Sequence, residues 1–487
     1  MTSAGAARLD VVVVGGGPNG LAAAVALARA GRSVEVVEAQ PTIGGGARSA
    51  ALTLPGYVHD VCSAIHALAR SSPFFRQLDL HRYGLRWIEP PVQLAHPFDD
   101  AETGFVFRDL DATAAAFGAD GDAYRSLMGP VVRDWDALIL GELAGPFRVP
   151  LNPLRAFSAA RFGLHAIQPV TWLARRFRTP QPQALLAGCA AHSMLRMNEP
   201  LSGAFGLTLL GSAHAAGWPI AEGGSQRIVD ALAACLADAG GSVVTGHRVT
   251  ALRDLRPHRV TLLDLTPRQI VSLAAERLRR GRFGGAYVRQ LQRYRYGPGV
   301  FKVDLALDAP LPWRDPRIGA AATVHLGGRL EEIAAGEAAI RRGRIPERPF
   351  VLLAQPSLFD SSRAPAGGHT VWAYCHVPNG SSVDMTDAIL GQIERFAPGA
   401  RERIVAMSTR SPADLERDNP NYVGGDIAGG LQDLRQFWTR PAIRIDPYRT
   451  PDPQLLICSS ATPPGNGVHG LCGWFAARSA LRGPLRE

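Results

Sequence analysis

Three glycines near the start of the chain have the spacing of a turn that binds phosphate groups. Gly15, Gly17 and Gly20 follow a run of four valines and fit the pattern GxGxxG. The first glycine permits a tight turn, the second lets the backbone approach a pyrophosphate, and the third lets the next helix pack close to the sheet. Glu38 ends a second valine-rich segment, where a carboxylate can accept hydrogen bonds from a ribose and repel a 2′-phosphate. Together these four residues predict a dinucleotide site.

A second glycine turn occurs near the other end of the sequence. Residues 465–470 also fit GxGxxG, between a strand-like run and a helix-like run. A separate NAD site would need a further strand and an acidic residue about 20 residues on, and the sequence ends at Glu487. We therefore expect this turn to complete the first site, with the backbone amides near Gly467, Val468 and His469 at the cofactor.

The apolar pattern predicts the elements that position these turns. Residues 11–14 and 33–38 read as buried parallel strands, and the alanine-rich segment 21–30 reads as the helix between them. Farther along, apolar residues at helical spacing predict an amphipathic helix over residues 226–239, followed by strands. This alternation indicates an α/β fold with a Rossmann-like sheet.

Longer segments carry a family resemblance. They include "GYVHDVCSAIHALARSSPFF", "YRYGPGVFKVDLALDAPLPW", "NPNYVGGDIAGG" and "PPGNGVHGLCGW". The chain resembles the phytoene-dehydrogenase-like FAD oxidoreductases, specifically the branch of the pyridine nucleotide-disulfide oxidoreductase domain-containing proteins. The resemblance implies FAD as cofactor. It also implies a Rossmann-like FAD-binding domain of the two-dinucleotide-binding type, interleaved with a mixed α/β substrate domain.

The resemblance further implies two cofactor contacts and a division of the chain. Arg48, after a second glycine cluster, would lie along the FAD pyrophosphate, and Val249 would pack beside the adenine. The expected division is stated by residue ranges: an FAD-binding domain of 1–110, 220–285 and 405–487, and a substrate domain of 111–219 and 286–404.

Two residues are candidates for catalysis. Lys302 is the single lysine of a chain in which Lys and Arg total 52. It lies in a segment similar to the strand of flavin amine oxidases whose lysine holds a water against flavin N5. A compact ammonium can orient water and shift its pKa. His376 is a candidate cleft residue because histidine titrates near neutral pH, and no metal-ligand spacing is evident.

The composition limits the kinds of partner and substrate that we expect. The net charge of +9 comes from arginines spread along the chain, which does not indicate a nucleic-acid partner. We expect an apolar or lipid-like small-molecule substrate and an electron acceptor such as oxygen or a quinone. No apolar run is long enough to span a bilayer, and we expect a cytoplasmic protein. Residues 152–180, including Arg155, mix arginines with Phe, Leu and Trp, which could allow peripheral membrane contact. The oligomeric state is left open.

Three functional interpretations follow. The first is a dehydrogenase, desaturase or oxidase that moves a hydride from the substrate to flavin N5. Lys302 favours a second, a flavin amine oxidase, although no aromatic cage for an amine is recognisable. The third is a flavoprotein whose FAD is structural or regulatory and which acts through a partner.

Overall fold

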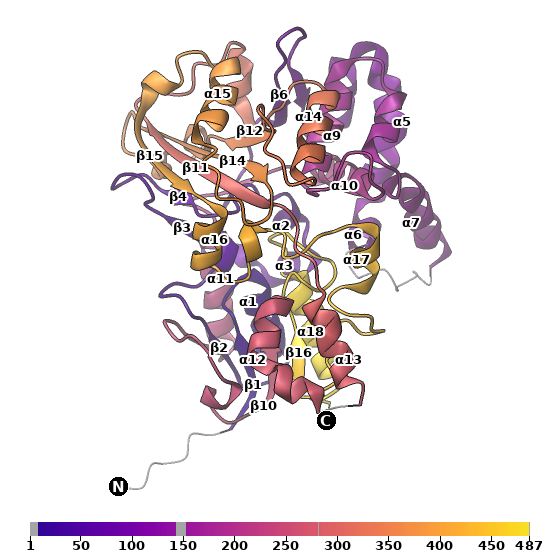
Figure 1. The fold of residues 1–487 in the computed structure, drawn as a ribbon, viewed down its shortest axis with the longest axis vertical. Helices are drawn as coiled ribbons and strands as arrows, with labels where there is room; N and C mark the ends of the chain where they lie inside the picture. The colour runs from indigo at the N-terminus through magenta and orange to yellow at the C-terminus, as the bar shows by residue number, and fades with distance from the viewer. Residues whose placement is uncertain (1–7, 143–151, 281, 487) are drawn as a thin grey trace.

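The structure is a computed structural model that describes residues 8–142, 152–280 and 282–486 (Figure 1). One half is built on a five-stranded sheet in which every neighbouring pair of strands is parallel. In spatial order its strands are β16 (Leu455–Ile457), β10 (His258–Leu263), β1 (Leu9–Val14), β2 (Val34–Val37) and β9 (Ser242–Val244). The runs of valine in β1 and β2 suit a parallel sheet that is covered on both faces.

Helices cover both faces of this sheet, and the alternation of side chains along β1 separates the two layers. Val11 and Val13 pack with α1 (Pro18–Ala28), α11 (Gln226–Asp238) and α18 (Leu471–Leu481). Val12 and Val14 pack with α12 (Pro267–Arg279) and α13 (Gly284–Gln292). Segments from the beginning, middle and end of the chain therefore share one core.

The other half contains a seven-stranded sheet. Its order is β15 (Ile404–Arg410), β11 (Gly299–Leu307), β14 (His369–Val377), β13 (Val351–Ala354), β12 (Ala321–Leu326), β6 (Val92–His96) and β7 (Gly104–Val106). All pairs are antiparallel except β12 with β6. On one face it packs against α15 (Thr386–Phe396).

A helical layer covers the other face of the seven-stranded sheet (Figure 1, upper right). It comprises α4 (Leu110–Ala116), α5 (Gly121–Arg133), α6 (Trp135–Glu142), α7 (Pro153–Ala166), α8 (Val170–Leu173), α9 (Pro180–Ala191), α10 (Ser202–Ala215) and α14 (Leu330–Ile340). None of the helices in the described ranges has the length and apolarity needed to cross a bilayer.

Short elements connect the two halves. They are the helices α2 (Ala67–Ser71), α3 (Pro73–Leu78), α16 (Pro412–Asp418) and α17 (Leu434–Thr439), and the strand pairs β3 (Ser49–Ala50) with β4 (His59–Asp60) and β5 (Trp87–Ile88) with β8 (Ile220–Ala221). Because the chain enters each sheet several times, the two halves are interleaved. The predicted α/β class is confirmed, with a Rossmann-like parallel sheet joined to a mixed second sheet.

The division of the chain is less regular than the one proposed from the sequence. Strands β6 and β7 lie within the proposed FAD-binding segment 1–110, yet they pair in the seven-stranded sheet. The sequence of a fully buried strand such as β6 does not indicate which sheet the strand joins. Its sheet depends on the strand with which it pairs, and that strand lies far away in the sequence. We propose moving this boundary to a point before β6.

Candidate functional site

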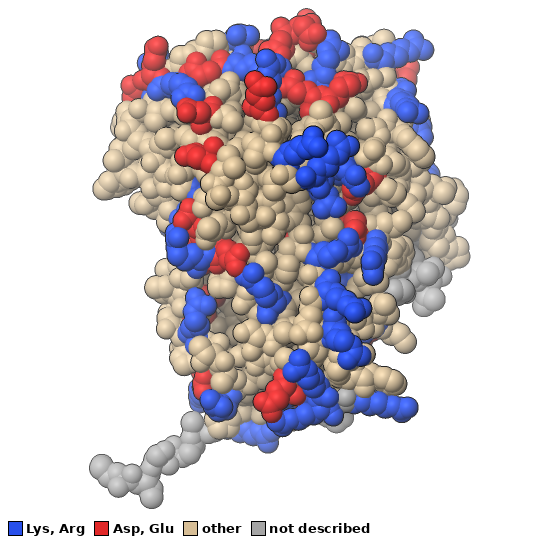
Figure 2. Space-filling model, in the orientation of Figure 1, with Lys and Arg blue, Asp and Glu red and all other residues tan. Residues whose placement is uncertain are grey.

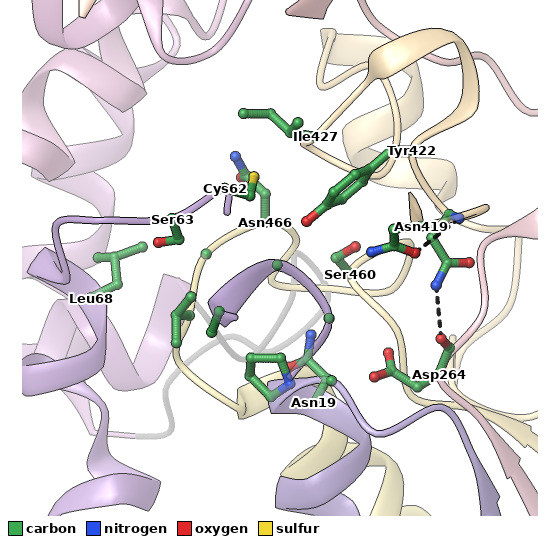
Figure 3. Close-up of a pocket in the computed structure, with 18 of the residues that line it drawn as sticks. Asn19, Cys62, Ser63, Leu68, Asp264, Asn419, Tyr422, Ile427, Ser460 and Asn466 are labelled. Carbon is green, nitrogen blue, oxygen red and sulfur yellow. Dashed lines mark hydrogen bonds between the residues drawn. The ribbon is translucent and has the colours of Figure 1, made fainter. Parts of the chain in front are cut away.

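A cavity of about 1020 Å³ lies between the two sheets (Figure 3). At one end it is lined by the segments that follow β1, β2 and β10, which is where parallel α/β sheets bind their ligands. At the other end it is lined by side chains of β12, β13 and β14 and of the helices α7 and α10. Its volume is at the upper limit of ordinary ligand pockets, which run to roughly 1,000 Å³.

The first glycine turn is packed so closely that it has no room for side chains. A Cβ on Gly15, where φ is +109°, would lie 2.9 Å from the Cβ of Asp264, and a Cβ on Gly17 would lie 2.9 Å from Asp264 Oδ2. A Cβ on Gly20 would lie 2.0 Å from the carbonyl oxygen of Gly15. Gly15 and Gly17 line the cavity, whereas Gly20 holds α1 against the turn and lies behind it. This backbone is open to a phosphate group.

Glu38 lies beside this turn and lines the same cavity. One carboxylate oxygen accepts the Gly16 amide at 2.7 Å, and the other accepts the Gln40 amide at 2.8 Å. These bonds hold the carboxylate in place, and its remaining lone pairs can accept hydroxyl groups. The position is consistent with a ribose contact.

Arg48 and Val249 also line the cavity. The Arg48 guanidinium donates to the carbonyl oxygen of Gly45 at 3.1 Å, which keeps its charge at the glycine cluster. Val249 is half-buried and packs against the core beneath α12. The structure thus brings both residues to the cavity that the first glycine turn also lines.

The glycine turn near the C-terminus reaches the same cavity. Gly467, with φ +119°, and Val468 both line it. A Cβ on Gly473 in α18 would lie 1.8 Å from the carbonyl oxygen of Asn19 in α1, so these two helices touch backbone to backbone. Their N-termini, the positive ends of two helix dipoles, therefore lie close together at the cavity.

His469 occupies a different position from its neighbours in the turn. It is fully buried and lies outside the cavity lining. Its Nδ1 accepts the Leu471 amide at 3.0 Å, and its Nε2 lies 3.2 Å from the carbonyl oxygen of Asn466. Burial lowers the pKa of His469 to about 4. The neutral imidazole thus caps the start of α18.

Lys302 is buried on β11, where it pairs with the lining residue Tyr374 of β14, and is itself outside the cavity lining. It forms an ion pair with Asp304, and its ammonium lies 5.9 Å from the ring centroid of Trp372, which lines the cavity. Burial lowers the pKa of Lys302, opposed by Asp304. Beyond Asp304 lies His59, 3.6 Å away. Lys302 therefore faces the cavity through Trp372.

His376 is also fully buried and lies outside the cavity lining. Its Nδ1 lies 2.7 Å from a carboxylate oxygen of Glu337. Its Nε2 has no hydrogen-bond partner in the part of the chain that the structure describes. Neither of the two residues singled out for catalysis thus opens directly into the cavity.

The remaining end of the cavity is largely apolar. Trp372 and Tyr374 on β14 line it, with their rings 5.1 Å apart and nearly perpendicular. The other apolar lining residues in this region include Phe162, Ala166, Phe205, Leu209, Trp218, Leu352 and Ile427. The carboxylates that line the cavity, those of Glu38, Asp264 and Asp418, come from segments outside this group. This end suits an apolar molecule.

Comparisons with known proteins agree with this arrangement. A family model described as an NAD(P)-binding Rossmann-like domain matches residues 13–79. The chain is 26% identical to the mouse (Mus musculus) pyridine nucleotide-disulfide oxidoreductase domain-containing protein 2, over 97% of this chain and 93% of that protein. It is 27% identical to a phytoene dehydrogenase of Streptomyces griseus, over 76% of this chain and 73% of that protein. The predicted resemblance is confirmed.

Solved structures show the same fold. An oxidoreductase from Methanosarcina mazei matches with a TM-score of 0.64 and 15% identity, over 97% of this chain and all of that one. Putrescine oxidase bound to putrescine matches with a TM-score of 0.58 and 15% identity, over 98% and 99% of the two chains. The chain thus has the fold and the sequence relationships of a flavin-type oxidoreductase.

Sequence reasoning missed two of the residues that line this cavity. Asp264 directly follows β10. Burial, reinforced by the nearby charge of Glu38, raises its pKa to about 7, so its carboxyl group is neutral at low pH. Its signal was a carboxylate at the end of the buried run "VTLL". His192 lines the apolar end of the cavity, and no sequence pattern marks it.

Proposed function

We propose that this protein is an FAD-dependent oxidoreductase that takes a hydride from an apolar or amphipathic small molecule. One observation carries the proposal: the two glycine turns, far apart in the sequence, open into one cavity whose other end is apolar. A dinucleotide fits the first turn, where glycine backbone and a helix N-terminus can accept a pyrophosphate beside Glu38. Oxygen or a quinone would serve as electron acceptor.

The residues divide into a nucleotide end and a reaction end. Gly15, Gly17 and Glu38 would hold the pyrophosphate and ribose, with Arg48 and Val249 alongside. FAD, when bound, would supply the hydride acceptor, N5. The amides at Gly467 and Val468, in front of the N-terminus of α18, would stabilise the negative charge that arrives with the hydride. The His469 imidazole would position this turn.

Lys302 and His376 would act as positioning residues at the reaction end. The Lys302–Asp304 pair would keep Trp372 oriented and place a positive charge behind it. His376 would stabilise the wall of the cavity through Glu337. The apolar lining would exclude water, which strengthens electrostatic interactions inside the site.

An amine oxidase is the second candidate function. Trp372 and Tyr374 offer an aromatic pair to a cation, and aromatic faces attract ammonium groups. Putrescine oxidase, a protein with this fold, is named for an amine. Against this, Lys302 already approaches the Trp372 ring, and two like charges near one ring repel. We therefore rank an apolar substrate first.

Two measurements test the proposed function. The absorption spectrum of the purified protein should show bound flavin, and the supernatant after denaturation should contain FAD. The protein is then mixed anaerobically in a stopped-flow instrument with phytoene in vesicles, dodecan-1-ol or benzylamine. We expect phytoene or dodecan-1-ol, the apolar probes, to bleach the flavin absorption. Bleaching by benzylamine alone would reverse our ranking. Bound FAD that no probe reduces would favour a structural or regulatory flavin.

We also propose that the cavity opens toward a lipid surface. Ile167, Leu434 and Trp438 line the cavity while 49%, 37% and 44% of their surfaces are exposed. Nearby along the chain, Trp172 is 58% exposed and is followed by two exposed arginines. Apolar side chains with arginines among them suit the surface of an anionic bilayer. The side chain of Arg155, within the same expected segment, lies outside those described.

A further inference from the structure

Three histidines line the cavity in the described part of the chain: His66, His247 and, at the apolar end, His192. It forms the C-terminal cap of α9 and lies among apolar lining residues such as Leu209, Trp218 and Leu352. His247 lines the nucleotide end beside Glu38, to whose carbonyl oxygen its amide donates at 2.9 Å. A histidine at the apolar end is the type of residue that can exchange a proton with a substrate.

A second imidazole holds His192 from behind. The Nε2 atoms of His192 and His325 are 3.2 Å apart, so one of them must carry a proton that the other accepts. His325 is fully buried on β12, and its Nδ1 has no hydrogen-bond partner within the described residues. A Cβ on Gly188 would lie 2.4 Å from that Nδ1, so glycine is required for His325 to pack against α9.

This pairing leaves the Nδ1 of His192 for a ligand in the cavity. When the shared proton is on His192 Nε2, its Nδ1 has a free lone pair and can accept a proton. Burial lowers the pKa of His192 to about 3, so the ring is neutral at physiological pH. The C-terminus of α9, the negative end of a helix dipole, favours the positive charge that proton uptake would create.

The other histidine that lines the cavity near this region cannot take the same role. His66 bonds through Nε2 to Ser225 Oγ at 2.8 Å, and its Nδ1 is buried without a partner among the described residues. Both of its nitrogens are therefore withdrawn from a substrate. Among the described residues, His192 is left as the lining histidine at the apolar end with a ring nitrogen open to a substrate.

We propose that His192 is the catalytic base of the reaction and that His325 positions it. This inference rests on the proposed function. A substrate C–H bond loses its hydride to the flavin, the neighbouring C–H or O–H bond loses its proton to His192 Nδ1, and the electron pair left behind becomes the new double bond. The hydrogen bond from His192 Nε2 to His325 Nε2 holds the His192 ring in the tautomer that leaves Nδ1 as the acceptor. An alkene precursor or an alcohol needs such a proton acceptor, whereas a neutral amine can lose a hydride without one because its nitrogen lone pair forms the new double bond. The base therefore assigns the first two substrate classes.

The test uses FAD-loaded full-length protein and anaerobic stopped-flow reduction by phytoene in phosphatidylcholine vesicles, dodecan-1-ol and benzylamine. His192→Gln should slow reduction by the first two probes about 100-fold, within the usual range for loss of a general base. The matched control is His214→Gln, because His214 is buried and bonds to Tyr124 at 2.7 Å outside the cavity lining. It should reduce at the wild-type rate.

Chemical rescue separates proton transfer from a structural effect. In His192→Ala, added imidazole should restore flavin reduction, and the rescued rate should rise with pH through the pKa of the added imidazole. The wild-type rate should be flat from pH 6 to 9.

The titratable groups that surround His192 come from three neighbouring elements. His325 on β12 and His376 on β14 face His192, and His376 pairs with Glu337 on α14. His96 on β6 faces His325.

The position of His325 has its own readout. His325→Phe should cost about tenfold in rate, and ¹⁵N NMR of labelled histidine should show the His192 proton redistributed between its two nitrogens. An unchanged tautomer in this variant would overturn the role of His325.

The outcomes are distinct. A His192→Gln variant that matches wild type on a probe that reduces wild type overturns the base assignment. Reduction by benzylamine alone, unchanged in His192→Gln, also overturns it while leaving an FAD oxidoreductase in place. Absence of FAD, or FAD that no probe reduces, defeats the proposed function and the base assignment with it.

Discussion

At the residue scale, Glu38 and Asp264 place two carboxylates beside one glycine turn, and the two are expected to behave differently. Both carboxylates line the cavity. Glu38 is buried and accepts two backbone amides, whereas Asp264 is half-buried and its side chain accepts the Gly20 amide. The first was predicted from its spacing to the glycines. The second was not, because the pKa of a carboxylate depends on burial that only the folded chain creates.

Glu38→Ala should weaken FAD binding. The loss of charged hydrogen bonds to a ribose costs about 1.5–3 kcal/mol, or roughly ten- to hundredfold in affinity. Fluorescence titration of the FAD-free protein measures this. Glu35→Gln is the matched control, because Glu35 lies on β2, just before Glu38, and pairs with Arg256 at 2.9 Å outside the cavity lining. Equal affinities for the two variants would contradict the ribose contact.

Asp264 should make FAD affinity depend on pH. Burial raises its pKa to about 7, so the carboxyl group is neutral below pH 7 and becomes an anion above it. An anion beside the turn repels a pyrophosphate, so the affinity should fall as pH rises through 7, by at most about tenfold per pH unit. Dissociation constants between pH 6 and 8.5 test this. Asp264→Asn should remove the dependence, and a wild-type affinity that is flat over this range would refute it.

At the element scale, the contact between α1 and α18 brings the two glycine turns together. The sequence predicted both helices and both turns, because apolar periodicity and glycine spacing are local signals. It did not predict Gly473, whose lack of a side chain lets the helices touch at Asn19. The signal for that contact is a single glycine inside a helix, which by itself has many explanations.

Gly473→Ala should separate the two helices. Its Cβ would lie 1.8 Å from the Asn19 carbonyl oxygen, and forced overpacking costs about 1–3 kcal/mol or more. Thermal unfolding should show a lower midpoint, and FAD binding should weaken. Gly391→Ala in α15 is the control, because a Cβ there meets nothing within 4 Å. Alanine in that helix should be neutral or stabilising by up to about 1 kcal/mol. Equal midpoints for the two variants would contradict the close contact.

At the scale of the whole molecule, charge is spread over the surface rather than collected in one groove. Figure 2 shows acidic and basic side chains mixed at the upper end of this face and mainly basic ones along its lower half. Among the exposed large apolar residues of the described chain, Ile167, Leu434 and Trp438 also line the cavity. The proposal of membrane contact therefore rests on the exposed apolar residues at the opening of the cavity and not on the overall charge.

Changes at the cavity mouth should weaken binding to lipid vesicles. The double change Trp172→Ser and Trp438→Ser removes two exposed aromatic side chains, and the bound fraction on phosphatidylglycerol vesicles should fall at least about fivefold in flotation assays. Phe283→Ser is the control, because Phe283 is 74% exposed and lies outside the cavity lining. Equal loss in the control, or no vesicle binding by wild type at low salt, would end the membrane proposal.

The sequence by itself determined the α/β class, the position of the glycine turn before Glu38, and the expectation that the C-terminal turn completes the same site. Spacing along one chain is enough for these, because each depends on strand and helix periods and on glycine backbone. Only the tertiary structure decided that Lys302 and His376 lie outside the cavity lining and that His192 belongs to it. Those positions depend on which strands pair across the seven-stranded sheet and on which helix covers them. Such long-range choices leave no periodic mark in the sequence.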